Sequence, residues 1–334
     1  MLKTNASFGR FLAVSRKNIE SSRKIYKNWV FTFFEYGDII IPIRKISCYL
    51  RGIYMNKIIT KKVLNPTVIY MEVDAPAVAK KAEPGQFIIL RVDENGERIP
   101  LTVAGFDREK GSVEIIFQVV GATTSALSKL EEGDCIHDFV GPLGNPTELD
   151  GLKKVAVVGG GVGCAIAYPI VKKLHDMGCT VHAVAGFRNK DLVILEDEFS
   201  ANSDKFVKVS DDGSWGDKGL VTDALKALIE SGEQYERVIT IGPLIMMKFV
   251  CLLTKQYDIK TIVSMNPIMI DGTGMCGGCR LTVGGKTKFA CVDGPDFDGH
   301  EVDFDQAMSR GGEYKEFEKH RYEESCNLFK KEVK

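Results

Sequence analysis

The chain has 334 residues, of which 44% are hydrophobic and 27% are charged, and its formal net charge is −1. That length suffices for two or three domains with their own cores, and the composition is that of an ordinary globular protein. Residues 1–55 carry ten Lys or Arg against three acids, a net charge of +7. The remaining chain therefore carries −8, which argues against nucleic-acid binding by the main body.

The cysteines and the apolar runs exclude two further classes of protein. Nine cysteines are scattered along the chain, an odd number that does not suggest a disulfide framework and favours a reducing cytoplasm. No run of about twenty uncharged apolar residues occurs, so no membrane span is expected. Four cysteines lie in apolar stretches and are interpreted as small buried hydrophobic residues, namely Cys135, Cys164, Cys179 and Cys251.

The first 55 residues differ from the rest of the chain. Their apolar patches start late and are interrupted by acids such as Glu35 and Asp38, which does not match a cleavable signal peptide. We expect an atypical extension that is disordered or untranslated, with the natural start at Met55, where a clean strand begins. A basic, aromatic segment that docks on a partner stays open as an alternative.

Residues 56–150 are predicted to form an antiparallel barrel. Many evenly spaced short strands without long intervening helices are typical of a barrel or a sandwich. One short helix is expected at 123–130. The expected strands are 58–64, 68–74, 85–93, 98–106, 112–120 and 135–141.

Residues 151–265 are predicted to form a doubly wound parallel sheet, because strands and helices alternate. The expected strands are 153–163, which runs into a glycine turn, 179–187, 206–212, 235–242 and 259–265. The expected helices are 164–178, 191–201, 221–231 and 244–258. A small hairpin module at 266–302 and a polar helical tail at 303–334 complete the chain.

The hairpin module carries the most specific motif of the chain. Asp271, Cys276, Cys279 and Cys291 follow one another at spacings x4, x2 and x11 in a glycine-rich loop. Three thiolates in a tightly wrapped loop suit a soft iron centre, and plant-type ferredoxins use C-x4-C-x2-C…C for a [2Fe–2S] cluster. The order is the same here, with Asp271 at the first position.

Two other interpretations of this loop are weaker. A structural zinc site normally needs four Cys or His ligands, and His300, the closest downstream histidine, lies outside the hairpin. A redox dithiol normally opens a helix in a thioredoxin-like context, whereas a strand-like segment comes next here. We therefore favour an iron–sulfur cluster. Ligation by Asp271 stays open on the residues alone, because an Asp-Gly pair is also an ordinary turn.

A glycine turn after an apolar strand is a candidate phosphate loop, made by Gly159, Gly160, Gly161 and Gly163. The turn is not a strict G-x-G-x-x-G, and plain strand–helix packing stays open as its role. Arg188 stands near the end of the second strand, where an acid would bind the ribose of NAD, so the choice between NAD and NADP also stays open. A nicotinamide would lie at the same sheet edge, beside Gly242 and Pro243.

The predicted barrel contains two further candidate motifs. Arg98 and Thr102 alternate on one strand face and can hold phosphate and flavin ring atoms. Gly121, followed by Thr123 and Thr124 at a helix start, supplies donors for a diphosphate. The alternative is a solvated Arg and an ordinary Thr cap, and the position of both motifs before a nucleotide fold favours the ligand-binding interpretation.

The layout of barrel, nucleotide domain and [2Fe–2S] hairpin resembles the ferredoxin-NADP-reductase-like electron-transfer subunits, from Met55 nearly to the end of the chain. The segment RIPLT resembles the flavin motif of these proteins, and the segment GPLGNP is also characteristic of them. The resemblance implies bound FAD, with Gly121, Thr123 and Thr124 at its diphosphate. The flavin contacts that it implies are Arg98, Pro100, Leu101 and Thr102.

Two relatives compete within this superfamily. The electron-transfer subunit of dihydroorotate dehydrogenase has four cysteine ligands and ends soon after the last one. The small subunit of NADH-dependent ferredoxin:NADP oxidoreductase, also known as a sulfide dehydrogenase subunit, has Asp at the first ligand position and continues with a segment like DGPDFDGHEVDFD. The chain resembles the second relative more, which implies that Asp271 is a cluster ligand. Residues 1–55 match neither relative.

The resemblance implies hydride transfer from NAD(P)H to FAD, and then single electrons through the [2Fe–2S] cluster to a partner. The implied partner is a larger flavin and iron–sulfur subunit linked to ferredoxin, in a cytoplasmic heterodimer that bifurcates electrons. The flavin is expected to perform the chemistry, so no catalytic side chain is predicted. The alternatives are the dihydroorotate dehydrogenase subunit, and a non-enzyme adaptor that binds a nucleotide or is stabilised by zinc.

Overall fold

The computed structural model of the protein describes residues 35–36, 39–40, 56–313, 316–320 and 322. The chain divides into two units, residues 1–52 and 53–334. The described part of the first unit is two short strands, β1 (Glu35–Tyr36) and β2 (Ile39–Ile40), which pair antiparallel. The expectations for the rest of the extension and for the tail beyond residue 322 fall outside the described residues.

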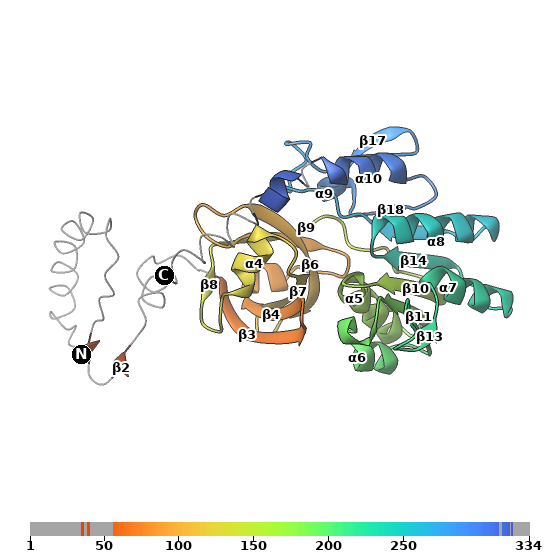
Figure 1. The fold of residues 1–334 in the computed structure, drawn as a ribbon, viewed down its shortest axis with the longest axis horizontal. Coiled ribbons are helices and arrows are strands. Elements are labelled where there is room, and N and C mark those ends of the chain that lie inside the picture. Colours follow the sequence, from red (N-terminus) through yellow and green to blue (C-terminus); the bar gives the residue numbers. More distant parts are fainter. Residues whose placement is uncertain (1–34, 37–38, 41–55, 314–315, 321, 323–334) are drawn as a thin grey trace, which may run out of the picture. The chain divides into compact units, whose positions relative to one another are not determined.

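The second unit begins with an antiparallel barrel whose seven strands follow the order β8-β3-β4-β7-β6-β5-β9 (Figure 1). Two short helices accompany the strands, α3 (Pro76–Ala79) and α4 (Ala122–Ser128). The strands are β3 (Asn56–Asn65), β4 (Val68–Asp74), β5 (Phe87–Arg91), β6 (Arg98–Asp107), β7 (Ser112–Gln118), β8 (Cys135–Ile136) and β9 (Asp138–Leu143).

The segment predicted as one strand at 135–141 is two strands that separate at His137. Strand β8 pairs with β3, whereas β9 pairs with β5 on the other side of the barrel. The chain therefore changes strand partner at this point, and Asp138 receives a hydrogen bond of 2.7 Å from Arg91 of β5. The polar pair His137–Asp138 marks this change in the sequence, but a single polar pair does not distinguish a change of partner from a continuous strand.

Strand β5 is buried on both of its faces. Successive side chains of a strand point to opposite faces of the sheet. Ile88 and Leu90 belong to the barrel core, whereas Phe87 and Ile89 belong to a separate core that also contains Cys279. This strand therefore lies between the barrel interior and the cluster module.

The second sheet has seven strands in the order β13-β12-β11-β10-β14-β15-β18, all parallel except β18 (Figure 1). Its strands are β10 (Lys154–Gly160), β11 (Thr180–Phe187), β12 (Lys205–Ser210), β13 (Asp217–Lys218), β14 (Arg237–Ile241), β15 (Thr261–Ser264) and β18 (Asp296–Asp298). Its helices are α5 (Gly163–Asp176), α6 (Glu196–Ala201), α7 (Val221–Glu230) and α8 (Leu244–Gln256).

Helices cover both faces of this sheet. In β10, Val155 and Val157 share a core with Ile170 of α5, whereas Ala156 and Val158 share the opposite core with α7 and α8. A strand buried on both faces reads as a continuous apolar run, as this one does. The antiparallel barrel and the doubly wound sheet confirm the predicted fold class.

Helix α6 is shorter than the predicted helix at 191–201. A 3₁₀ turn, η1 (Lys190–Leu192), precedes it, and Val193 is extended. Leu195 then adopts a left-handed backbone with φ of 58°, so the α-helix begins only at Glu196. The prediction of one continuous helix was wrong, because the apolar spacing of this segment is the same whether or not the helix is interrupted at Val193 and Leu195.

The hairpin module predicted at 266–302, here called the cluster module, begins with a loop that runs to Cys279. An antiparallel hairpin of β16 (Arg280–Val283) and β17 (Lys286–Phe289) comes next, followed by α9 (Ala290–Asp293). Strand β18 lies inside the range predicted for this module but joins the parallel sheet beside β15. Helix α10 (Phe304–Gly312) opens the tail, where residues 316–320 and 322 are also helical. No helix in the described ranges is long and apolar enough to cross a membrane.

Candidate functional site

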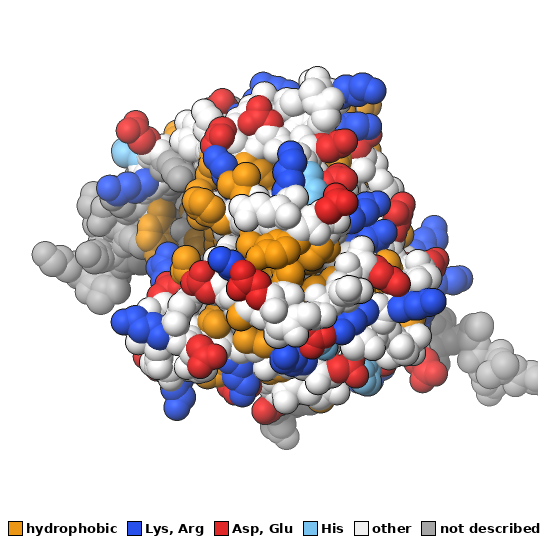
Figure 2. All heavy atoms as spheres, turned by 90° about the vertical axis from the view of Figure 1, so that its right-hand side faces the viewer, with side chains coloured by type: hydrophobic (Ala, Val, Ile, Leu, Met, Phe, Trp, Pro, Cys, Tyr) orange, Lys and Arg blue, Asp and Glu red, His pale blue; other side chains and the backbone are white. Residues whose placement is uncertain are grey.

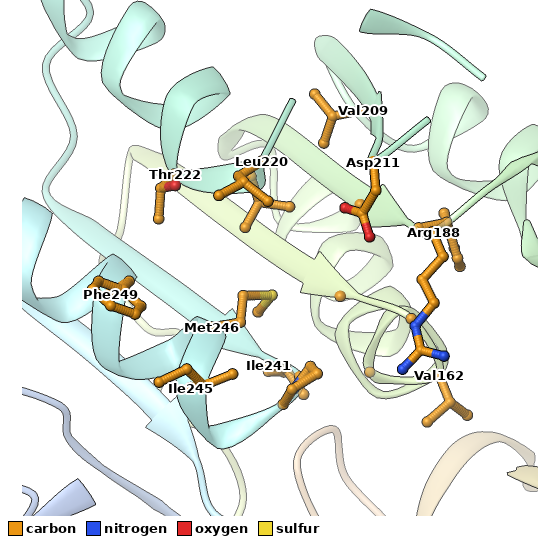
Figure 3. Close-up of a pocket in the computed structure, with 18 of the residues that line it drawn as sticks. Val162, Arg188, Val209, Asp211, Leu220, Thr222, Ile241, Ile245, Met246 and Phe249 are labelled. Atoms are coloured by element: carbon orange, nitrogen blue, oxygen red, sulfur yellow. The ribbon is translucent and has the colours of Figure 1, made fainter. Parts of the chain in front are cut away.

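A cavity of about 1000 Å³ opens at the carboxyl ends of β10, β11, β12 and β14. Parallel α/β sheets bind ligands at this edge. The cavity brings together two motifs predicted from the sequence, the glycine turn after β10 and the pair Gly242–Pro243 after β14. Figure 3 shows side chains from several strands and from α8 that line it. Of the predicted turn residues, Gly160, Gly161 and Gly163 line the cavity.

Close packing explains most of these glycines. A Cβ at Gly163 would lie 2.5 Å from the carbonyl oxygen of Ile241, and a Cβ at Gly242 would lie 3.2 Å from the amide nitrogen of Gly160. Gly159 is not among the cavity-lining residues, and a Cβ there would lie 2.8 Å from the sulfur of Cys164. Gly159 therefore serves strand–helix packing, which was the alternative for the whole turn.

Helix α5 offers an anion-binding end at this turn. Its N-cap is Val162, and no side-chain hydrogen bond caps it. The first amides of a helix have no partner within the helix, and the helix dipole favours an anion there. The arrangement therefore suits a diphosphate beside the glycine turn.

Two charged side chains line the cavity, Arg188 after β11 and Asp211 after β12 (Figure 3). The Asp211 amide donates a 3.1 Å hydrogen bond to the Phe187 carbonyl, so the ends of the two strands are tied together. Asp211 was not predicted, because the acid was sought at the end of the second strand. The signal available in the sequence was the SDDG turn after the third strand.

The outer part of the cavity is apolar. Leu220 before α7, and Ile245, Phe249 and Leu252 on α8, line the cavity and are half exposed. Hydrophobic side chains gather around a hollow on the face shown in Figure 2, the side on which α7 and α8 lie in Figure 1. An exposed apolar surface next to the candidate phosphate turn can receive the flat ring of a nucleotide base.

The predicted flavin residues lie on β6, where strand alternation separates them into two sets. Ile99 and Leu101 pack against the barrel core, so Arg98, Pro100 and Thr102 lie on the other face. Any contact of Leu101 with a ligand on that face would be made by its backbone. The guanidinium of Arg98 is half exposed, which leaves it available to an anion.

The guanidinium of Arg98 lies 3.9 Å from a carboxylate oxygen of Asp138. Burial by itself would raise the pKa of Asp138, but hydrogen bonds from Arg91 and His137 outweigh burial and hold this pKa below its usual value. Asp138 is thus anchored by other partners and holds Arg98 only loosely. Exposed ion pairs of this kind contribute little, so a ligand phosphate can compete for Arg98.

The second barrel motif lies next to the first. The Thr123 hydroxyl donates a 2.9 Å hydrogen bond to the carboxylate of Glu97, the neighbour of Arg98. The Thr124 hydroxyl accepts hydrogen bonds of 3.0 Å from the amides of Val120 and Gly121. The N-cap of α4 is Gly121 and not a threonine, so Thr124 stabilises the helix start from the third helical position. The start of α4 is held beside the Arg98 motif.

Three of the predicted cluster ligands, Asp271, Cys276 and Cys279, lie in the loop before β16, and Cys291 lies in α9 after the hairpin; the four residues form two close pairs. The sulfurs of Cys279 and Cys291, both buried, are 3.3 Å apart, too far for a disulfide bond. The carboxylate of Asp271 accepts hydrogen bonds of 2.8 Å from the amide of Thr273 and 3.0 Å from the amide of Cys276. Cys276 itself is exposed. Over the described residues, no three His, Cys, Asp or Glu side chains are arranged as a metal site.

The chemistry of these donors fits an iron–sulfur cluster. Burial, followed by the neighbouring Cys279, raises the pKa of Cys291 to about 11, so a cation is needed to hold the Cys291 thiolate near neutral pH. A zinc site would need a fourth Cys or His. His300 is held elsewhere, because its Nε2 lies 3.0 Å from the hydroxyl of Thr254. Three thiols and one carboxylate are the donors that the loop and α9 offer together.

Comparison with known proteins gives concordant findings. Residues 266–303 match the family model described as the iron-sulfur cluster binding domain of dihydroorotate dehydrogenase B. The chain is 48% identical over 272 residues to a Thermotoga maritima protein named "dihydroorotate dehydrogenase B (NAD(+)), electron transfer subunit homolog", which covers 81% of this chain and 96% of the relative. It is 33% identical over 262 residues to the corresponding electron transfer subunit of Desulforamulus reducens, which covers 74% of this chain and 99% of the relative.

A solved structure agrees with these relatives. One chain of the structure described as giving "insights into flavin-based electron bifurcation via the NADH-dependent reduced ferredoxin-NADP oxidoreductase" is 45% identical to this chain. The TM-score is 0.78, and the match covers 82% of this chain and 99% of the solved one. The similarity therefore extends over the barrel, the parallel sheet and the cluster module together.

Proposed function

The chain belongs to the family of the electron transfer subunits of dihydroorotate dehydrogenase B and their homologues, and we propose that it passes electrons from NAD(P)H through FAD and a [2Fe–2S] cluster to a partner subunit. The relatives confirm the predicted membership of the ferredoxin-NADP-reductase-like superfamily. The individual ligand contacts are proposals that the geometry supports.

The residues of the sheet edge bind the nicotinamide nucleotide in this proposal. The turn from Gly160 to Gly163 and the start of α5 hold its diphosphate, and Gly242 and Pro243 lie beside the nicotinamide. In the barrel, Arg98, Pro100 and Thr102 contact FAD, with Gly121, Thr123 and Thr124 at its diphosphate. Bound flavin supplies the conversion between two-electron and one-electron transfer. The ligands of the cluster are Asp271, Cys276, Cys279 and Cys291.

The observation that carries the proposal is the position of β5. One face of this strand contributes Ile88 and Leu90 to the barrel core, and the other contributes Phe87 and Ile89 to the core that contains Cys279 and Cys291. Phe87 and Ile89 pair directly with Thr102 and Pro100 of β6, so the proposed flavin residues share one face of the sheet with the core that contains the cluster thiols. Electrons leaving a flavin on the barrel have a short path to the cluster through packed protein.

The relatives also bear on which partner subunit receives the electrons. The chain is 45% identical to a subunit of the NADH-dependent ferredoxin-NADP oxidoreductase structure and 33% identical to a dihydroorotate dehydrogenase B subunit. We therefore propose a larger flavin and iron–sulfur subunit linked to ferredoxin, in a cytoplasmic complex. Of the seven cysteines in the described part of the chain, none forms a disulfide bond, which suits a reducing compartment.

Anaerobic purification of the protein tests the proposal. Absorption spectroscopy, EPR after dithionite reduction, and iron, zinc and flavin analysis are made on the same sample. We expect about one FAD and about two irons per chain, with a rhombic signal on reduction. A colourless protein that holds zinc or no metal would overturn the proposal and favour the adaptor. Reconstitution with each candidate partner then distinguishes ferredoxin-linked NADP reduction from dihydroorotate oxidation.

A further inference from the structure

The dinucleotide cavity contains one acid and one base among its described lining residues, Asp211 and Arg188. We propose that Asp211 is the residue that makes this subunit prefer NADH to NADPH. The inference rests on the proposed function, since it requires that the cavity bind a nicotinamide dinucleotide. The two nucleotides differ only by a phosphate on the 2′-oxygen of the adenosine ribose, so a single charge at that place can decide between them.

The backbone places Asp211 where the ribose is expected. Dinucleotide folds usually supply the ribose acid from the end of the second strand, where Arg188 stands here. Asp211 follows the third strand, β12, and its amide is bonded to Phe187 at the end of the second strand, β11. The third strand therefore delivers the carboxylate to the same edge of the sheet.

The side chain of Asp211 is available to a ligand. In the structure, its carboxylate forms no hydrogen bond or ion pair with any described residue, and neither does the guanidinium of Arg188. The next residue, Asp212, behaves differently, because its carboxylate accepts hydrogen bonds of 2.9 Å and 2.7 Å from the amide and hydroxyl of Ser214. Asp212 is not one of the cavity-lining residues. Two adjacent acids thus have separate roles, one in the turn and one in the cavity.

The position of Arg188 leaves Asp211 unneutralised. In Figure 3 the Arg188 side chain extends toward Val162, at the glycine turn. We assign this guanidinium to the diphosphate, which the turn and the start of α5 also bind. The ribose end of the cavity is then negative. Ribose hydroxyls donate to a carboxylate there, whereas a 2′-phosphate would meet a like charge.

Calorimetric titration of the oxidised holoprotein with NAD⁺ and with NADP⁺ tests this assignment without turnover. Asp211→Asn removes the charge and keeps the shape, and Asp212→Asn removes an equal charge one residue away as the matched control. We expect the wild type to prefer NAD⁺. In Asp211→Asn the ratio of the two affinities should shift toward NADP⁺ by about tenfold or more, the value of one hydrogen bond to a charged group. Asp212→Asn should keep the wild-type ratio.

Each other outcome has a distinct meaning. Equal shifts in the two variants, or no shift in Asp211→Asn, would overturn the role of Asp211 while leaving the cavity a dinucleotide site. A wild type that prefers NADP⁺ would do the same. A wild type that binds neither nucleotide would overturn the proposed function as well. Absorption spectra of flavin and cluster show whether each variant is folded and loaded.

Discussion

The protein has two glycine-rich loops, and they need glycine for different reasons. In the turn after β10, Gly163 has an ordinary backbone but no room for a side chain, because a Cβ would lie 2.5 Å from the Ile241 carbonyl oxygen. In the cluster loop, Gly277 adopts φ of +67°, and the nearest atom to a Cβ there is 3.9 Å away. The first loop depends mainly on the close approach of the start of α5 to the end of β14, with one left-handed glycine at Gly161, whereas three left-handed glycines shape the second, namely Gly272, Gly274 and Gly277.

This difference suggests that the two sites are built independently. The nucleotide turn is fixed by regular elements on both sides, a strand and a helix of fourteen residues. The cluster loop from Asp271 to Cys279 has no regular element of its own and is shaped by turns and by the groups it binds. Damage to one site should therefore leave the other intact, and variants of each loop test this independence.

The largest effect is expected for Cys279→Ser. A buried thiolate ligand is replaced by a weaker donor, so the protein should lose most of its iron and the visible absorption of the cluster. Binding of NAD⁺ should not change. Cys179→Ser is the matched control, because Cys179 is also a buried thiol but precedes β11 at the opposite end of the strand from the cavity. Iron loss in the control as well would show that the measurement reports general instability.

Gly163→Val should produce the reverse result. The new side chain overlaps the Ile241 carbonyl, which costs about 1–3 kcal/mol and displaces the glycine turn. NAD⁺ affinity should fall by about tenfold or more, with the iron content preserved. Gly178→Ala at the other end of α5 is the control, since φ of +76° strains alanine where no atom lies nearby. It should lower the melting temperature without weakening NAD⁺ binding.

Asp271→Ala should lower the cluster occupancy or shift the cluster potential while FAD stays bound, because a hard oxygen ligand is removed. Asp271 also accepts two backbone hydrogen bonds, so Asp271→Asn is needed beside it. The amide can still accept one of these bonds but is a poor ligand. A change in Ala alone would assign Asp271 to the turn, and an unchanged spectrum and potential in both variants would remove it from the ligand list.

The smallest effect concerns Asp296 on β18, which accepts a 2.6 Å hydrogen bond from Thr147. The residue is only partly buried, but its other carboxylate oxygen is shielded from water and has no partner. Burial raises its pKa from the ordinary 3.8 to about 6, against hydrogen bonds from Thr147 and Ser264 that lower it. The folded state therefore holds this proton more tightly, and the resulting stability is lost as the pH rises through about 6.

Unfolding by urea measures this contribution. The free energy of unfolding of the wild type, relative to Asp296→Asn, should fall by about 1 kcal/mol between about pH 5 and about pH 7. The cluster and nucleotide sites should keep their properties in the variant. A difference that stays constant with pH would mean that the carboxyl group does not titrate in this range.

The regular parts of the fold were predictable, and the reasons are visible in single strands. Residues 155–158 of β10 are apolar without interruption because α5 covers one face and α7 and α8 cover the other. The start of α6 was not predictable, because the left-handed conformation of Leu195 has no signature in the apolar spacing. Strand β18 was also missed, because a strand of only three residues is too short to show an alternation of apolar and polar residues.

The candidate sites divide in the same way. The cluster ligands were proposed from spacing, because the four residues lie within one short segment of sequence. Asp211 could not be found by spacing, since its place beside Arg188 depends on the pairing of β11 with β12. Glu97 and Thr123 illustrate the same limit, because only the folded barrel brings their side chains within 2.9 Å.

The pairing of β18 with β15 has a consequence for the maturation of the protein. Ser264 and Asp296 are direct partners in this pairing, so the segment 265–295, with all four proposed ligands, begins and ends in the same sheet. The pairing of β15 with β18 closes this segment, and the entropy of bringing its ends together is lost when the sheet forms. Iron can then enter a segment whose two ends are already fixed at their final separation. Cluster insertion is in that case a local ordering step that comes after folding of the chain, and it can be repeated if the cluster is lost.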